Sequence, residues 1–230
     1  MRYAAYLFDV QGTLLDFFVP VRDAISQYLG SLGKESHDAG ELTRQWRANY
    51  FRRVAGLRQS VDSWTRVHDE YAAGFLDLCE QHGIAPPDVS QLDALAASWT
   101  RLVPWPDTVP GLARIRRHAI TGTLSNADMQ TMVRLFKRLD ITWDVVLTAE
   151  VFGAFKPDPI VYQRAVRYLG LKPHDVAMVA CHPYDLRAAA DVGLGTVFVK
   201  RPDEYGDVSL AHQAADHEFG QQVSSVFDIQ

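Results

Sequence analysis

Residues 1–14 read MRYAAYLFDVQGTL, and this stretch decides the expected fold. The run from Tyr3 to Phe8 is short and apolar, and it ends at Asp9 with Gly12 close behind. A short apolar run closed by a turn signal predicts a strand that is buried on both faces of a sheet. Asp9 is therefore expected at the carboxyl end of the first core strand.

Strands and helices alternate after residue 104. The predicted strands cover residues 120–124, 145–148, 176–179 and 196–199, and the predicted helices cover 109–117, 128–139, 159–169 and 185–192. This alternation implies parallel βαβ units, so we expect the α/β class with a doubly wound, Rossmann-like parallel sheet. Ligands of such sheets bind at the carboxyl ends of the strands.

The segment between the first strand and residue 101 has only helical periodicity. The predicted helices cover residues 21–32, 40–57, 64–83 and 90–102, and the second has Leu42, Trp46 and Tyr50 in its apolar stripe. We therefore expect an all-helical cap at residues 17–100, inserted after the first strand. Residues 1–16 and 101–230 are then the core.

Composition describes a globular chain with a buried core. Of its 230 residues, 47% are hydrophobic and 22% are charged. The net charge of -5 argues weakly against a nucleic-acid partner, and the N-terminal apolar run is too short for a signal peptide or a membrane span. The spacing of Cys79 and Cys181 suggests neither a disulfide framework nor a zinc site, which favours the reducing cytoplasm.

Polar side chains follow four predicted strands at the points where they end. They are Asp9, then Ser125 and Asn126, then Lys156, and finally Cys181, His182 and Asp185. Each has an ordinary structural explanation, such as a turn cap, a helix N-cap, a surface charge or a partner of the helix dipole. Their occurrence together at one edge of a sheet predicts a site beneath the helical insert.

Four segments resemble the motifs of the haloacid dehalogenase superfamily. They are FDVQGTL (8–14), TLSN (123–126), KPDP (156–159) and VACHPYD (179–185), and they occur in the family's order. The helical block fits the cap that this family inserts after the first motif. The resemblance implies a hydrolase with Asp9 as its nucleophile.

Two positions distinguish the phosphatases from the dehalogenases of this superfamily. Magnesium phosphatases have a second aspartate two residues after the nucleophile, and this chain has Gln11, which cannot exchange protons. They usually have an acidic residue where this chain has Cys181, and a thiol is a poor magnesium ligand. We therefore expect no metal and no cofactor. Halide needs neither a metal nor, in most cases, a proton to leave.

The stretch LTRQWRANY (42–50) is similar to a segment of type II (L-2-haloacid) dehalogenases whose arginine holds the departing halide. The resemblance assigns that role to Arg47, for which a solvated helix face is the alternative. Tyr162 matches a tyrosine of the same family, and simple packing is its alternative. The histidine at position 182 is similar to that of a subgroup with histidine in the fourth motif, which includes members active on fluoroacetate. Pro183 and Gln11 depart from the family pattern.

The mechanism implied by the resemblance is hydrolysis of a small 2-halocarboxylate through an aspartyl ester. Asp9 attacks C2, halide leaves towards Arg47, and water then attacks the ester. Lys156 stabilises the Asp9 carboxylate, while Asp185, helped by His182, orients or deprotonates the water. The implied substrate-binding residues are Thr13, Gln11, Arg47, Ser125, Asn126 and Tyr162.

Two alternatives stay open at this stage. The first is a phosphatase or another small-molecule hydrolase of the same superfamily. The second is a catalytically silent binding or regulatory protein on the same scaffold. The halogen, the acid chain length, the stereochemical preference and the oligomeric state, a homodimer included, are also open.

Overall fold

The computed structural model of the protein describes residues 1–57 and 59–230. Its main sheet has five parallel strands in the order β4–β1–β5–β6–β7. The strands are β1 (Ala5–Phe8), β4 (Ile120–Thr123), β5 (Val176–Ala180), β6 (Gly195–Val199) and β7 (Gln221–Val223). The predicted α/β class is thus confirmed.

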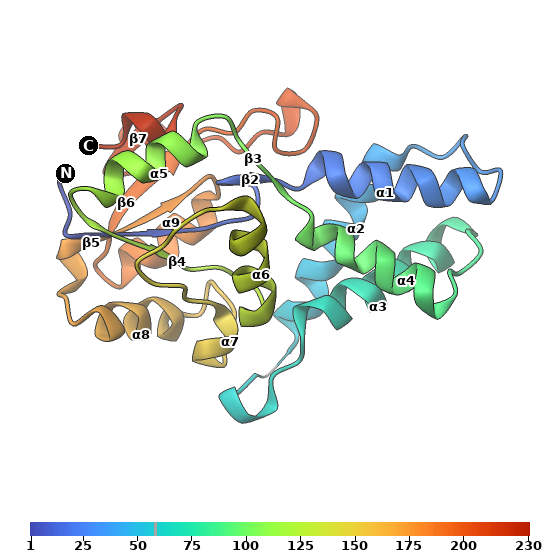
Figure 1. Ribbon diagram of the computed structural model, residues 1–230, viewed down its shortest axis with the longest axis horizontal. Coiled ribbons are helices and arrows are strands. Elements are labelled where there is room, and N and C mark those ends of the chain that lie inside the picture. The colour runs from blue at the N-terminus through green and yellow to red at the C-terminus, as the bar shows by residue number, and fades with distance from the viewer. Residues whose placement is uncertain (58) are drawn as a thin grey trace.

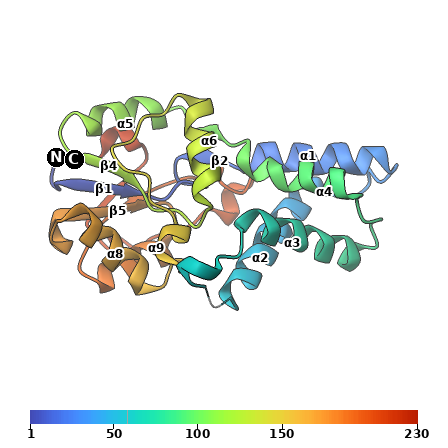
Figure 2. The same ribbon diagram turned by 60° about the horizontal axis from the view of Figure 1, so that its bottom comes forward.

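Helices cover both faces of this sheet, α5 and α6 on one side and α8 and α9 on the other (Figure 2). Their bounds are α5 (Thr108–Arg116), α6 (Met129–Leu139), α8 (Pro159–Leu169) and α9 (Pro183–Asp191). Successive side chains of a strand point to opposite faces. Tyr6 and Phe8 therefore pack on the α5–α6 side, and Ala5 and Leu7 pack on the other. The first strand is apolar throughout because both of its faces are covered.

Four further helices form a block beside the sheet, at the right in Figure 1. They are α1 (Phe18–Ser31), α2 (Ala39–Ala55), α3 (Val67–His82) and α4 (Val89–Ala96), with the 3-10 turns η1 (Val61–Ser63) and η2 (Ala97–Thr100). The side chains of Asp38 and Asp88 cap α2 and α4. Phe17, on the link from the core, stacks on Trp99 of the block, and both belong to one apolar cluster with the α5–α6 face of the sheet.

Short pairings and irregular segments differ from the sequence-based prediction. Residues 145–148 form only isolated parallel bridges, from Val145 to Gly122 and from Thr148 to Ser125. The ribbon of β2 (Leu15–Asp16) with β3 (Val103–Pro104), which joins the two links between block and core, was not predicted. Nor were β7, η1, α7 (Ala149–Phe152), η3 (Pro173–Asp175), η4 (Val208–Leu210) and η5 (Val226–Asp228), whereas η2 lies within the helix predicted at residues 90–102. Elements of two to five residues are too short to show a periodic pattern.

The start of the third helix was also predicted wrongly. Trp64 was assigned to it, but the helix begins at Val67, and Trp64 itself has an extended backbone. The Trp64 indole nitrogen donates to Oδ1 of Asp128 at 2.8 Å, so a tertiary contact holds the residue outside the helix. Among the helices in residues 1–57 and 59–230, none is both long enough and apolar enough to cross a membrane.

Gly111 of α5 packs so closely on η5 that a side chain has no room there. A Cβ at this position would lie 2.7 Å from Cγ1 of Val226 and 2.9 Å from the backbone nitrogen of Phe227. We expect Gly111→Ala to lower the free energy of unfolding by about 1–3 kcal/mol through overpacking, measured by urea denaturation. Gly30→Ala in α1 is the control, since nothing lies within 4 Å of its Cβ, and it is expected to raise stability by about 0.5–1 kcal/mol. Shifts of the same sign in both variants would contradict this packing.

Candidate active site

Asp9 follows β1, and its buried carboxylate is contacted from three sides. Oδ1 accepts a hydrogen bond from Nζ of Lys156 at 2.9 Å, and Oδ2 accepts one from Oγ1 of Thr13 at 2.8 Å. Nδ1 of His182 lies 3.1 Å from Oδ2, in a direction that is poor for a hydrogen bond. Burial by itself raises the pKa of Asp9, but Lys156 and His182 outweigh it and hold the pKa far below its ordinary value. Asp9 is therefore an ionised carboxylate.

Lys156 lies in the connection between α7 and α8 and bridges two carboxylates. Its Nζ donates to Asp9 and, at 2.5 Å, to Oδ2 of Asp185. Burial by itself lowers the pKa of Lys156, but Asp185 and Asp9 raise it above the ordinary value. The backbone of Lys156 is fixed by Asn126, whose side-chain oxygen accepts from its nitrogen at 2.7 Å and whose amide donates to its carbonyl at 3.0 Å. Asn126 thus positions the lysine.

Asp185, near the start of α9, has both oxygens engaged. One accepts from Lys156, and the other accepts from the hydroxyl of Tyr162 at 2.6 Å. Burial raises the pKa of Asp185 above its ordinary value, although Lys156 opposes that shift. Burial and the Asp185 charge raise the pKa of Tyr162 so far that its hydroxyl remains a donor. The side chain of Tyr162 is fully buried and serves Asp185.

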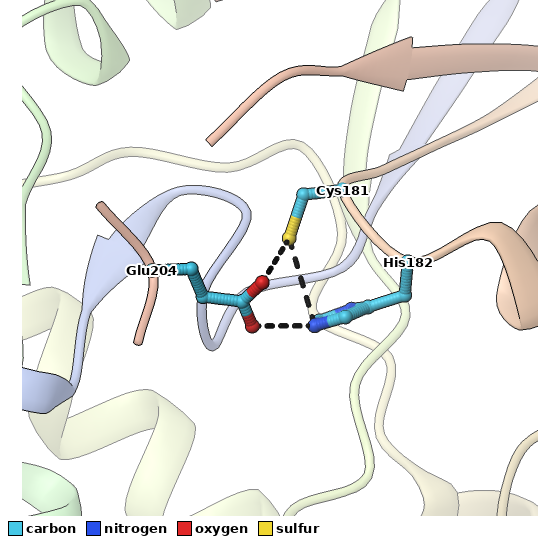
Figure 3. Close-up of side chains that lie close together, drawn as sticks. All are labelled: Cys181, His182 and Glu204. Carbon is cyan, nitrogen blue, oxygen red and sulfur yellow. Dashed lines mark hydrogen bonds and ion pairs between the residues drawn. The ribbon is translucent and has the colours of Figure 1, made fainter. Parts of the chain in front are cut away.

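Glu204, which the sequence analysis missed, is a buried carboxylate that faces His182 and Cys181 (Figure 3). Its Oε1 accepts from Nε2 of His182 at 2.8 Å, and Sγ of Cys181 lies 3.5 Å from both of these side chains. Burial by itself lowers the pKa of His182, but Cys181, Glu204 and Asp9 raise it well above the ordinary value. Glu204 lies in the segment after β6, so the strand-end argument applied to one more strand would have found it.

Gly12 provides the space that Glu204 fills. A Cβ on residue 12 would overlap Oε1 of Glu204, and the backbone has a φ of +85°, which favours glycine. The turn after β1 therefore shapes the histidine side of the site as well as the nucleophile. Glycine is the only residue that meets both requirements there.

Arg47 of α2 is a buried cation, 3% exposed, and no carboxylate pairs with it in the described part of the chain. Its Nη1 donates to Oε1 of Gln11 at 3.2 Å, whereas its Nε has no hydrogen-bond partner among the described residues. The Phe17 ring centre lies 4.1 Å from its Cζ. Burial by itself lowers the pKa of Arg47, but Tyr71, Tyr205 and Glu204 raise it, so the guanidinium stays charged.

Gln11 links the turn after β1 to the helical block. Its side-chain oxygen accepts from Arg47 and from the hydroxyl of Tyr71 at 3.2 Å, and its amide lies 3.5 Å from the carbonyl of Trp99. Ser125 is buried at the end of β4, and its carbonyl accepts from the nitrogen of Ala149 at 2.8 Å. Within the described residues no hydrogen bond joins its hydroxyl to the groups around Asp9.

The structure thus brings most of the candidate residues into two groups. Asp9, Thr13, Lys156, Asp185, Tyr162, Asn126 and His182 form one contiguous group. Gln11 and Arg47 form the second, on the side of the helical block. Their catalytic and substrate-binding roles stay predictions.

A cavity of about 1280 Å³ opens where the helical block faces the core. Phe51 and Val54 of α2 line one side, and Lys156, His182 and Tyr205 are among the residues that line the other. Both Lys156 and His182 are nearly buried, so they form part of the cavity's inner wall. The cavity therefore reaches Lys156 and His182, the two cationic residues beside Asp9, although Asp9 itself is not among its lining residues.

A fold of this kind, with a buried aspartate and lysine at the strand ends, belongs to a known class of hydrolases. A family model for haloacid dehalogenase-like hydrolases matches residues 3–193, and the chain belongs to this family. The resemblance drawn from the four motifs is therefore confirmed.

Individual relatives come from both sequences and solved structures. (S)-2-haloacid dehalogenase 4A of Burkholderia cepacia is 29% identical, covering 91% of this chain and 89% of its own length. The crystal structure of an L-2-haloacid dehalogenase is 33% identical with a TM-score of 0.84, covering 98% of this chain and 97% of its own. That of a defluorinating L-2-haloacid dehalogenase is 32% identical with a TM-score of 0.85, covering 98% and 93%.

The hydrogen bond from Tyr162 to Asp185 is expected to contribute measurably to stability. Tyr162→Phe keeps the ring but leaves a buried carboxylate oxygen without its donor, so we expect the free energy of unfolding to fall by about 1.5–3 kcal/mol. Tyr168→Phe on the same helix is the matched control, because Tyr168 is 58% exposed and its change should cost less than about 0.5 kcal/mol. Denaturant titration of both variants measures the difference. Equal values would mean that the hydroxyl of Tyr162 adds nothing.

Proposed function

We propose that the protein is a hydrolytic dehalogenase of small 2-haloalkanoic acids, and that it acts through an ester on Asp9 without a metal. The (S)-2-haloacid and L-2-haloacid dehalogenases among its relatives support the reaction class. In this proposal residues 17–100 are a cap that supplies Arg47, and residues 1–16 and 101–230 are the core that supplies Asp9.

The observation that carries the proposal is the state of Arg47. A buried charge is costly unless a counter-charge accompanies it, and among the described residues only neutral groups bond to this guanidinium. Glu204 acts on Arg47 only at a distance, whereas an anion that forms during the reaction bonds to the guanidinium directly. Halide leaving a carbon centre is such an anion, and Arg47 stabilises it as the charge develops.

The first half of the reaction is a displacement at C2. Asp9 is ionised, and Lys156 and Thr13 each hold one of its oxygens, so the carboxylate is oriented before the substrate arrives. One Asp9 oxygen forms a bond to C2 while the carbon–halogen bond breaks, and the halide takes the electron pair. Attack from the face opposite the halogen inverts C2, and water later attacks the carboxyl carbon of Asp9, so the product keeps this inverted configuration.

The second half is hydrolysis of the ester, for which His182 is better placed than Asp185. Both oxygens of Asp185 are engaged by Lys156 and Tyr162, whereas Nδ1 of His182 faces Asp9 and has no hydrogen-bond partner among the described residues. Ester formation removes the Asp9 charge, one of the groups that raise the pKa of His182, and the imidazolium then releases its Nδ1 proton to water in the cavity and becomes neutral. With Nε2–H on Glu204, Nδ1 then accepts a proton from the attacking water. Asp185 keeps Lys156 in place.

The magnesium phosphatase alternative has less support. Gln11 stands where a proton-exchanging aspartate is needed, and its side-chain oxygen already accepts from Arg47 and Tyr71. Cys181 provides a thiol where magnesium prefers oxygen. Phosphate release that depends on magnesium, combined with no halide release from any 2-haloacid, would favour this alternative. If the protein shows neither phosphate release nor halide release, the binding-protein alternative is favoured.

Substitutions at the two charges test the proposal. We expect Asp9→Asn to abolish chloride release from 2-chloropropionate, and Arg47→Ala to lower kcat about 10²–10³-fold, the usual loss for one stabilising donor. Arg52→Ala is the matched control, since Arg52 lies on the same helix but is exposed, and its rate should stay near that of the unchanged protein. Chloride titration gives the rates, and circular dichroism shows that each variant folds. An unchanged rate in Arg47→Ala would remove its halide role.

Heavy-oxygen labelling tests the ester separately. Multiple turnovers in H₂¹⁸O should place ¹⁸O in the peptide that contains Asp9, because water attacks the carboxyl carbon of Asp9, and a metal chelator should leave the rate unchanged. Mass spectrometry of the peptide and chloride titration with and without chelator are the measurements. An unlabelled peptide beside measured product would show direct attack of water on C2.

A further inference from the structure

Cys181, His182 and Glu204 bring a sulfur, a nitrogen and an oxygen donor together, as Figure 3 shows. Sγ of Cys181 lies 3.5 Å from Nε2 of His182 and 3.5 Å from Oε2 of Glu204, and Oε1 of Glu204 lies 2.8 Å from the same Nε2. All three residues are at most 2% exposed. The donors converge on one point from the end of β5 and the segment after β6.

These separations come close to the donor spacings of a metal tetrahedron, with Glu204 presenting Oε2 to the sulfur and Oε1 to the nitrogen. Zinc bonds to sulfur, nitrogen and oxygen at about 2.3, 2.05 and 2.1 Å place S···N and S···O about 3.6 Å apart and N···O about 3.4 Å apart. The two sulfur distances already agree within a tenth of an ångström or so. The hydrogen-bonded pair at 2.8 Å uses the other carboxylate oxygen, Oε1, so an ion that takes one oxygen of Glu204 has to replace the shared proton and shift the carboxylate.

The surroundings also suit an ion. Zinc-binding histidines usually turn their second nitrogen to a carboxylate, and Nδ1 of His182 lies 3.1 Å from Asp9. Thr13 lies beside the thiol, with Oγ1 3.4 Å from Sγ of Cys181. On the outer side His212 is one-third exposed, with Nε2 3.8 Å from Oε2 of Glu204. His212 and His182 both line the large cavity, which provides access for a hydrated cation.

We propose that Cys181, His182 and Glu204 form a binding site for one thiophilic divalent cation, with zinc as the best match, and that its occupation inhibits the enzyme. A soft thiolate with imidazole and one carboxylate favours zinc or cobalt over magnesium. Three protein ligands leave a fourth position for water. The binding itself is independent of the proposed function, and the inhibition rests on it.

Inhibition follows from the tautomer that the ion imposes. Binding releases the thiol proton of Cys181 and the proton on Nε2 of His182, because the ligands are thiolate and neutral imidazole. A neutral imidazole whose Nε2 holds a metal carries its remaining proton on Nδ1. Nδ1 then donates and can no longer accept a proton from water. Ester hydrolysis stops, while the displacement half keeps all its groups.

Cobalt binding tests the site without any substrate. We expect Co²⁺ to bind one per chain with the near-ultraviolet charge-transfer band of a cobalt–thiolate bond, and Zn²⁺ to displace it. Cys181→Ser should lose the band, and both Cys181→Ser and Glu204→Gln should weaken zinc binding more than about 100-fold, beyond the usual effect of an outer-shell change. Cys79→Ser is the matched control, because Cys79 is the other buried thiol and lies in α3. A band that survives in Cys181→Ser, or no band in the unchanged protein, would overturn the site.

Halide release tests the consequence. In each variant the rate with Zn²⁺ is divided by the rate after chelation, so differences in basal activity cancel. We expect at least a tenfold inhibition in the unchanged protein and in Cys79→Ser. With a labelled substrate, the ester on Asp9 should accumulate in these two proteins. Inhibition of Cys181→Ser should be less than twofold. Bound zinc that leaves the rate unchanged would overturn the inhibitory role. Absence of halide release under all conditions would instead refute the proposed function, and the cobalt measurement would still decide the site.

Discussion

The ammonium of Lys156, buried between the carboxylates of Asp9 and Asp185, is the interaction on which the rest of the site depends. It joins the end of β1 to α9 through the α7–α8 connection. Burying such charges is costly unless every remaining lone pair has a donor, and the neighbours meet this need. Thr13 serves Asp9, Tyr162 serves Asp185, and Asn126 fixes the backbone of the lysine. Thr13, Asn126 and Tyr162, which were predicted to bind substrate, therefore make hydrogen bonds that support the Asp9–Lys156–Asp185 triad.

The cost of burying charge also applies to the residues around the Lys156 triad. At the site, the carboxylates of Asp9, Asp185 and Glu204 and the cationic side chains of Lys156, His182 and Arg47 are buried together. His182 lies between two of the carboxylates, whereas Arg47 has only neutral hydrogen-bond partners in the described part of the chain. This difference between the partners of His182 and Arg47 gives the two sides of the site different chemistry. In the proposed reaction the arginine side binds the departing anion and the histidine side transfers the proton in hydrolysis, and the proposed cation would use the same histidine-side donors.

The sequence predicted the positions of residues that lie in segments with a strong hydrophobic pattern. The apolar run before Asp9 and the alternating elements after residue 104 led to the sheet, and parallel strands bring their carboxyl ends to one edge, so Asp9, Lys156 and Asp185 followed. Residues 145–148 were predicted as a strand but form only isolated bridges. An apolar run does not reveal whether the neighbouring strand will form a continuous series of hydrogen bonds with it. Glu204 was missed because the strand-end argument was not carried to β6, and because its position 22 residues from His182 in an irregular segment matches no spacing signature.

The sequence by itself determined the fold class, the family and the set of charged residues at the strand ends, because hydrophobic periodicity and motif order are local properties of the chain. Tertiary structure alone decided which of these residues touch. It committed Asn126 and Tyr162 to supporting Lys156 and Asp185, left Arg47 without a carboxylate among the described residues, and placed Glu204 against His182 over Gly12. Such contacts depend on the packing of segments far apart in sequence, and no local pattern records them.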